Sequence, residues 1–165
     1  MTDYLNIAWQ GSPIPVPPSD RLNLPGHWAD VRFDQDIADA AGHHAAGSHL
    51  FGKGPRFING KLLLRLEGFT PGVEIQVRTY EVRADGSRVE GHEPDEFYTS
   101  PIPPDSDEAG NYLYPARTHK HLHIWSYINT GHRLGVELSQ WPHGPASAPT
   151  GVIAFAQFVG TLEAP

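Results

Sequence analysis

Hydrophobic and polar positions alternate along most of this chain, the period expected of half-buried β-strands. The pattern is clearest in residues 61–67, where Leu62, Leu64 and Leu66 share one side and polar residues share the other. The same alternation recurs in residues 31–37 (Val31, Phe33 and Ile37), 73–80 (Val73, Ile75, Val77 and Thr79), 119–128 and 133–140. We therefore expect strands with one face toward a core.

The last strand, Val152–Leu162, differs because it is apolar on both sides. Such a strand is central in a sandwich or covered by another subunit. Turn signals separate the strands, among them Ala84-Asp85-Gly86-Ser87 and Asn129-Thr130-Gly131. With no amphipathic helix in the pattern, the sequence predicts an all-β fold, an antiparallel β-sandwich or jelly roll.

The first 27 residues read as an extended, proline-rich N-terminal arm, and residues 28–165 as the jelly-roll β-sandwich domain. Prolines at high density fix an extended path and remove hydrogen-bond donors. We expect the arm to dock on a neighbouring subunit through Tyr4, Leu5, Ile7, Trp9, Pro13, Pro15, Pro17 and Pro18.

Composition narrows the classes of function. The 165 residues include 17 Gly, 16 Pro and no Cys, and the net charge is -7. Disulfides, thiolate metal sites and cysteine nucleophiles are therefore excluded, and an acidic chain without a basic patch argues against nucleic acid. We find no apolar run long enough for membrane insertion and no signal peptide, so we expect synthesis in the cytoplasm.

Catalytic motifs such as G-x-S-x-G, H-E-x-x-H and phosphate-binding glycine loops do not occur. The chain is therefore interpreted as a non-enzymatic structural or binding protein. His43, His44 and His49 fall in a Gly- and Ala-rich segment and are expected to face solvent.

Alternate residues of one strand carry His119, His121 and His123, on the same face as Trp125 and Tyr127. Three interpretations stay open. The imidazoles are simply polar residues of an exposed strand, they hold a transition metal within one chain or on a three-fold axis, or they form a pH-responsive contact. An H-x-H pair, His121 and His123, would also suit a cupin-like metal enzyme.

Aromatic residues are frequent enough to form a sugar-binding platform or a subunit interface. The candidates for the platform are Tyr80, Tyr98, Tyr112, Tyr114, Trp125, Tyr127 and Trp141. We favour the interface, and assign it to His119, His121, His123, Trp125, Tyr127, Phe155 and Phe158.

The C-terminal third resembles the closing strands of the tumour-necrosis-factor and complement globular-head jelly rolls. The resemblance rests on residues 129–138, a Gly turn followed by Leu134-Gly135-Val136-Glu137-Leu138, and on Phe158-Val159-Gly160-Thr161-Leu162. Residues 110–114 resemble a third strand of that family. The resemblance implies a homotrimer with the aromatic face of one sheet on its axis.

Modules of this kind also occur as accessory virion proteins of tailed bacteriophages. This chain resembles them in its proline-rich N-terminal segment, its lack of cysteine and its acidic charge. The expected function is therefore a minor tail or tail-tip component of a virion that contacts other virion proteins and a host-surface glycan. A capsid decoration protein is the alternative within that class. A cupin-like enzyme and a carbohydrate-binding module are alternatives of other classes.

Overall fold

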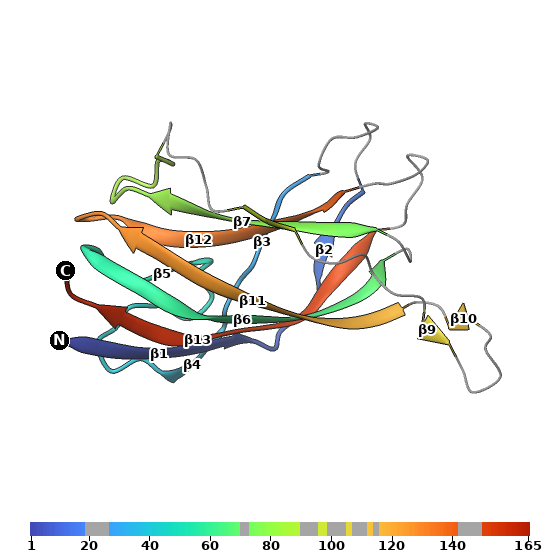
Figure 1. Ribbon diagram of the computed structural model, residues 1–165, viewed down its shortest axis with the longest axis horizontal. Coiled ribbons are helices and arrows are strands. Elements are labelled where there is room, and N and C mark those ends of the chain that lie inside the picture. Colours follow the sequence, from blue (N-terminus) through green and yellow to red (C-terminus); the bar gives the residue numbers. More distant parts are fainter. Residues whose placement is uncertain are drawn as a thin grey trace.

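The computed structural model describes residues 1–18, 27–69, 73–89, 96–98, 105–106, 112–113, 116–141 and 150–165. Two antiparallel β-sheets pack face to face, and the described residues contain no helix. Figure 1 shows the two layers edge-on, with both chain termini at the same end of the sandwich. The all-β sandwich expected from the sequence is confirmed. Since no helix is present in these ranges, none of them holds a helical membrane span.

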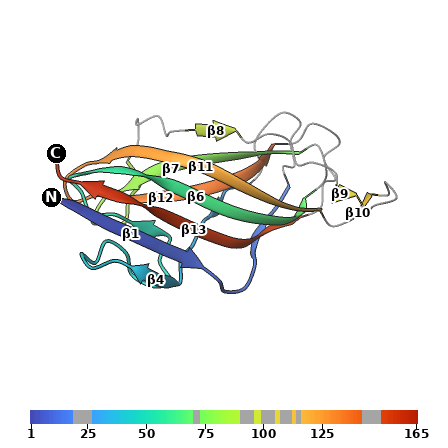
Figure 2. The same ribbon diagram turned by 60° about the horizontal axis from the view of Figure 1, so that its bottom comes forward.

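The first sheet has the order β11-β6-β13-β1-β4, with β2 added on β13. Its strands come from both ends and the middle of the chain: β1 (Thr2–Trp9), β2 (Ile14–Val16), β4 (Gln35–Ala38), β6 (Arg56–Phe69), β11 (Ala116–Ile128) and β13 (Gly151–Glu163). The long strands β11, β6, β13 and β1 run side by side in Figure 2.

The second sheet has the order β3-β12-β7-β8, with β5 added on β12. Its strands are β3 (Ala29–Asp30), β5 (Leu50–Phe51), β7 (Glu74–Val82), β8 (Glu96–Tyr98) and β12 (Arg133–Trp141). A separate small pair joins β9 (Asp105–Ser106) to β10 (Tyr112–Leu113).

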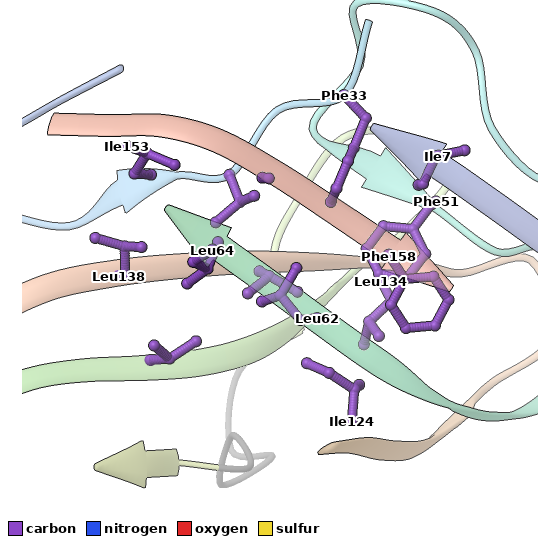
Figure 3. Close-up of a cluster of buried hydrophobic side chains, with 14 of the residues drawn as sticks. Ile7, Phe33, Phe51, Leu62, Leu64, Ile124, Leu134, Leu138, Ile153 and Phe158 are labelled. Carbon is purple, nitrogen blue, oxygen red and sulfur yellow. The ribbon is translucent and has the colours of Figure 1, made fainter. Parts of the chain in front are cut away.

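The core lies between the sheets and follows the alternation read from the sequence. Leu62 and Leu64 of β6 meet Leu134 and Leu138 of β12 in this layer, and all four are at most 1% exposed (Figure 3). Both expected turns are also present. Gly86 and Gly131 adopt positive φ angles of 85° and 77°, a backbone conformation that glycine reaches without strain.

A β-bulge in β13 explains why that strand looked apolar on both sides. The pairing with β6 shifts register between Ile153 and Phe155, so the inward-facing positions change parity there. Ile153 before the bulge and Phe158 after it are both fully buried, although they are five residues apart. The sequence period did not reveal this change of parity. Of the two positions expected for such a strand, β13 takes the central one, between β6 and β1.

Phe158 therefore belongs to the core, and its expected place in an oligomer interface is not what the structure shows. Its ring lies 4.9 Å from that of Phe51 (Figure 3). A Cβ built on Gly60 would come within 2.5 Å of the same ring, so only glycine leaves room for Phe158 at this crossing.

The N-terminal segment also differs from the expected arm. β1 pairs with β13 on one side and with β4 on the other, and Leu5 and Ile7 are fully buried. Tyr4 is exposed, Trp9 is half-buried, and Pro15 pairs with Val152 as part of β2. Pro13 is exposed, and Pro17 and Pro18 are half-buried. β1 and β2 are thus integral strands of the first sheet, because the apolar side chains Leu5, Ile7 and Val16 are buried in the core of the same chain.

The strand predicted for residues 31–37 is confirmed only in part. Val31 and Phe33 are buried as predicted, but Ile37 is 54% exposed on the short edge strand β4. Residues 110, 111 and 114 of the third family-like segment lie outside the described residues.

Candidate interaction surface

The outward side of the first sheet carries rows of side chains set by the strand register. One row runs Tyr127, Phe57, Glu163 and Thr2 across β11, β6, β13 and β1. The next row runs Trp125, Asn59, Thr161 and Tyr4. Because the alternate positions are buried in the core, these side chains face away from it.

Large aromatic side chains are concentrated in those two rows. Trp125 is 63% exposed, Tyr4 52%, Phe57 38% and Tyr127 37%. The rings of Phe57 and Tyr127 contact each other with centroids 4.9 Å apart. We call these four residues, together with His119, His121 and His123, the aromatic face. A concentration of exposed aromatic side chains on one side of a sheet commonly marks an interaction site.

The three histidines lie on the aromatic face, as the strand period predicted. His119, His121 and His123 are exposed, and their register partners on β6 are Arg65, Leu63 and Lys61. The imidazole Nε2 of His123 lies 2.6 Å from Oδ1 of Asn59.

In the described ranges, no three His, Asp or Glu side chains come close enough together to hold a metal ion. His121 and His123 point outward and not into the space between the sheets. The metal and pH-responsive interpretations of the histidine strand stay predictions, which depend on a second chain.

Several residues of this surface were missed by the sequence reasoning. Phe57 and Asn59 were not assigned because the strand was read as starting at Lys61, whereas β6 begins at Arg56. Extending the Leu62–Leu64–Leu66 alternation backwards would have placed both on the outward side. Of the residues that were assigned, Phe155 lies on this side of β13 opposite Arg65 and is half-buried.

The candidate residues of a sugar-binding platform that the structure describes do not all share one surface. Trp125 and Tyr127 lie on the outward side of the first sheet, whereas Tyr80 lies in the second sheet. Tyr114 and the side chains of Tyr98, Tyr112 and Trp141 are outside the described residues.

His43 and His44 were expected to face solvent, but they are only 3% and 6% exposed. The Asp39 carboxylate accepts hydrogen bonds from both of their backbone N–H groups at 2.7 Å. Nε2 of His43 lies 3.1 Å from Asp3 of β1, and Nδ1 of His44 bonds Asp36 of β4. These pairs fasten the connection after β4 to the edge of the first sheet, so the histidines have a structural role. His49 is half-exposed.

The outward side of the second sheet is dominated by an ion-pair network. Glu137 is 1% exposed and accepts from Nε of Arg78 at 2.5 Å and from both terminal nitrogens of Arg88 at 2.9 and 2.7 Å. The hydrogen bond to Glu137 raises the pKa of Arg88. Arg88 also stacks 3.8 Å above the Tyr80 ring. Because the charges of Glu137, Arg78 and Arg88 pair with one another, we interpret this network as structural.

A second buried carboxylate, Glu81, lies at the end of β7. Its oxygens accept from Nδ2 of Asn129 at 3.0 and 3.2 Å, and Nδ1 of His132 lies 2.7 Å away. Burial alone would raise the pKa of Glu81, but the hydrogen bonds from His132 and Asn129 outweigh it and hold the pKa below its ordinary value.

This lowered pKa predicts a pH dependence. A carboxyl group with a depressed pKa in the folded state stabilises the protein above its unfolded-state pKa of about 4.3. That contribution is lost as the pH falls through the lower folded-state value. We expect the free energy of unfolding, measured with urea between pH 7 and 3, to fall with acidity, and to fall less steeply in Glu81→Gln. Parallel pH profiles for the two proteins would contradict this role for Glu81.

No protein-family model matches the chain, and no curated protein sequence matches it with significance. Among solved structures, the globular domain of a zebrafish complement 1qA protein is similar with a TM-score of 0.49 and 7% identity, over 99% of this chain and 97% of that one. The Eiger TNF of S. frugiperda is similar with a TM-score of 0.46 and 12% identity, over 99% and 96%. A CocE/NonD family hydrolase of Staphylococcus aureus gives 0.45 and 9%, over 98% and 37%. Folds of this kind carry many functions, so the likeness does not choose one.

Proposed function

We propose that this chain is a non-enzymatic assembly module that forms a homotrimer through its aromatic face. The observation that carries the proposal is the exposure of Trp125, 63%, on the outward side of the terminal strand β11, in one row with Tyr4 and next to the row of Phe57 and Tyr127. Tryptophan and tyrosine supply a large apolar area with few rotatable bonds, and both are enriched where subunits meet.

The charges of this surface favour contact between copies of the same chain. The whole chain has a net charge of -7, which opposes self-association in general. The outward sides of β6 and β13, however, carry two cations, Lys61 and Arg65, and two anions, Glu67 and Glu163. These four charges cancel, so the outward sides of the two central strands carry no net charge to repel another copy.

The edge of the first sheet is a less suitable contact. β11 is the terminal strand and would offer backbone groups for strand addition. Lys120 of this strand points inward and is only 9% exposed, and burial lowers the pKa of its ammonium group. An inward-pointing lysine on an edge strand discourages edge-to-edge pairing. The face of the sheet is therefore the proposed contact.

The wider setting is proposed as a phage virion, where the module acts as a minor tail or tail-tip component, with capsid decoration as the alternative. It rests on the sequence resemblance and on the acidic, cysteine-free composition. Mass spectrometry of purified particles, with and without detached tails, would locate the protein. Absence of the protein from both fractions would contradict a location in the virion. The assembly role has its own test, because it does not depend on that location.

A single substitution tests the assembly role. Trp125→Glu places a negative charge in the aromatic face at a side chain that points away from the core, so we expect the solution mass to fall from three chains to one. The matched control is Ala84→Glu, which adds the same charge to the exposed 84–87 turn of the second sheet and should leave the mass unchanged. Equal masses for both variants and the wild type would reject the aromatic face as the contact.

A further inference from the structure

A groove separate from the aromatic face lies beside the N-terminal strands. One wall is formed by the segment from Trp9 to Pro17, and the other by residues His27 to Arg32. β2 and β3 belong to these two walls and lie close together (Figure 1). The groove has a volume of about 580 Å³, within the range of small-molecule sites in proteins.

The apolar lining of the groove is held in place before any ligand arrives. Nε1 of Trp9 donates to the backbone oxygen of Ser12 at 3.1 Å, and its ring lies so close to Gly11 that a Cβ there would come within 2.7 Å. One side of the Trp28 ring is covered by the Arg78 guanidinium, 3.8 Å from the ring centre. Pro13 and Pro15 stiffen the wall beside them. Rings fixed in this way bind without a large cost in side-chain entropy.

The polar rim combines acceptors and donors. Oδ1 of Asp30 accepts from the Tyr80 hydroxyl at 2.6 Å and lies 3.8 Å from Nη2 of Arg88, which orients the carboxylate. Burial and this hydrogen bond raise the pKa of Tyr80, so the hydroxyl keeps its proton. Arg32 and His27 are exposed and make no hydrogen bond or ion pair with a described residue.

This combination of groups selects among ligand classes. The negative charge of Asp30 disfavours binding of a free anion, and the positive charge of Arg32 disfavours binding of a free cation. A proline-rich peptide uses indole N–H groups to bond its carbonyl groups, and since the N–H of Trp9 is already used within the chain, the two tryptophans of the groove leave only that of Trp28. A sugar ring presents a C–H face for stacking on an indole and hydroxyls that both donate and accept, which fits the rings and the mixed rim together.

We propose that this groove is a carbohydrate-binding site, in which a sugar ring stacks on Trp9 or Trp28 and its hydroxyls bond Asp30 and Arg32. The site does not depend on the aromatic face or on the oligomeric state. Its failure and the failure of trimer formation are therefore separate results.

The test uses the full chain on a printed array of neutral and acidic oligosaccharides, with each bound glycan measured again by titration calorimetry. We expect at least one glycan to bind, and its dissociation constant to rise at least tenfold in Trp28→Ala and in Arg32→Ala. Arg32→Ala removes no hydrogen bond or ion pair within the described part of the fold, so it is a control for a general loss of structure in Trp28→Ala. Lys53→Ala removes the same charge at another exposed position and should bind as the wild type does.

Three outcomes would overturn the proposal. They are binding to no glycan on the array, equal binding by the wild type and both groove variants, and binding of a decaproline peptide in this groove in place of any glycan. Thermal unfolding of every variant accompanies the titrations, and a variant that is not folded at the assay temperature is replaced by Trp28→Phe.

Discussion

Replacing Phe158 with alanine is expected to lower the free energy of unfolding by about 3–5 kcal/mol, the range observed when a buried aromatic ring is removed. Phe158 is fully buried, contacts Phe51 and fills the space left by Gly60. Removing the ring would leave a cavity between two rigid strands, β6 and β13, which pair with each other along most of their length. Urea unfolding at fixed protein concentration measures the change.

Phe155→Ala is the matched control, because it removes the same ring from the other side of the same strand. Phe155 is half-buried on the outward side, so we expect a loss of about 1 kcal/mol or less in stability. If the two variants lost equal stability, the assignment of Phe158 to the core and Phe155 to the outward side would be wrong.

The second large effect is expected for Glu137→Gln. The side chain of Glu137 is 2% exposed, and its charge faces both Arg78 and Arg88. The neutral amide of glutamine has the same shape but cannot neutralise two guanidinium groups. Its NH2 group would also point a hydrogen-bond donor at an N–H donor of an arginine. Removing one partner of a buried ion pair costs about 3–5 kcal/mol when the other partner stays buried. Because Arg78 and Arg88 are 26% and 48% exposed and can regain water, we expect about 2–3 kcal/mol.

Glu67→Gln provides the comparison for that experiment. Glu67 pairs with Arg65 at 3.2 Å, but the two side chains are 26% and 40% exposed. Exposed pairs of this kind contribute between zero and about 1 kcal/mol. Urea unfolding of both variants in the same buffer measures the difference, and a loss for Glu137→Gln no larger than for Glu67→Gln would show that the network does not stabilise the fold.

The regular strands were predictable because one face of each meets a core. In β6, β7 and β12 the apolar period of two leads directly to the buried side chains, such as Leu64, Val77 and Val136. The bulge in β13 was not predictable, because a change of parity places apolar residues at both odd and even positions of the strand, such as Ile153 and Phe158. The N-terminal strand was not predictable either, because the burial of Leu5 and Ile7 depends on pairing with β13 and β4, whereas the prolines that follow favour an extended arm.

The candidate surface was predictable in part. The period of β11 placed Trp125, Tyr127 and three histidines on one side, and the structure confirms that side as outward. The residues that complete the surface, Tyr4 and Phe57, come from strands more than 50 residues away in sequence, and only the sheet order β11-β6-β13-β1 brings them together. Burial of His43 and His44 was equally hidden, because their partners Asp3 and Asp36 belong to separate strands.

The most direct test of the account is the solution mass of the unmodified protein, measured by light scattering over a hundredfold range of concentration. Assembly through the aromatic face predicts a mass of three times 18.2 kDa, about 55 kDa, at the upper end of that range. Metal analysis of the same sample would report whether the histidine strand holds an ion. A mass of 18.2 kDa at every concentration would contradict the proposed self-association.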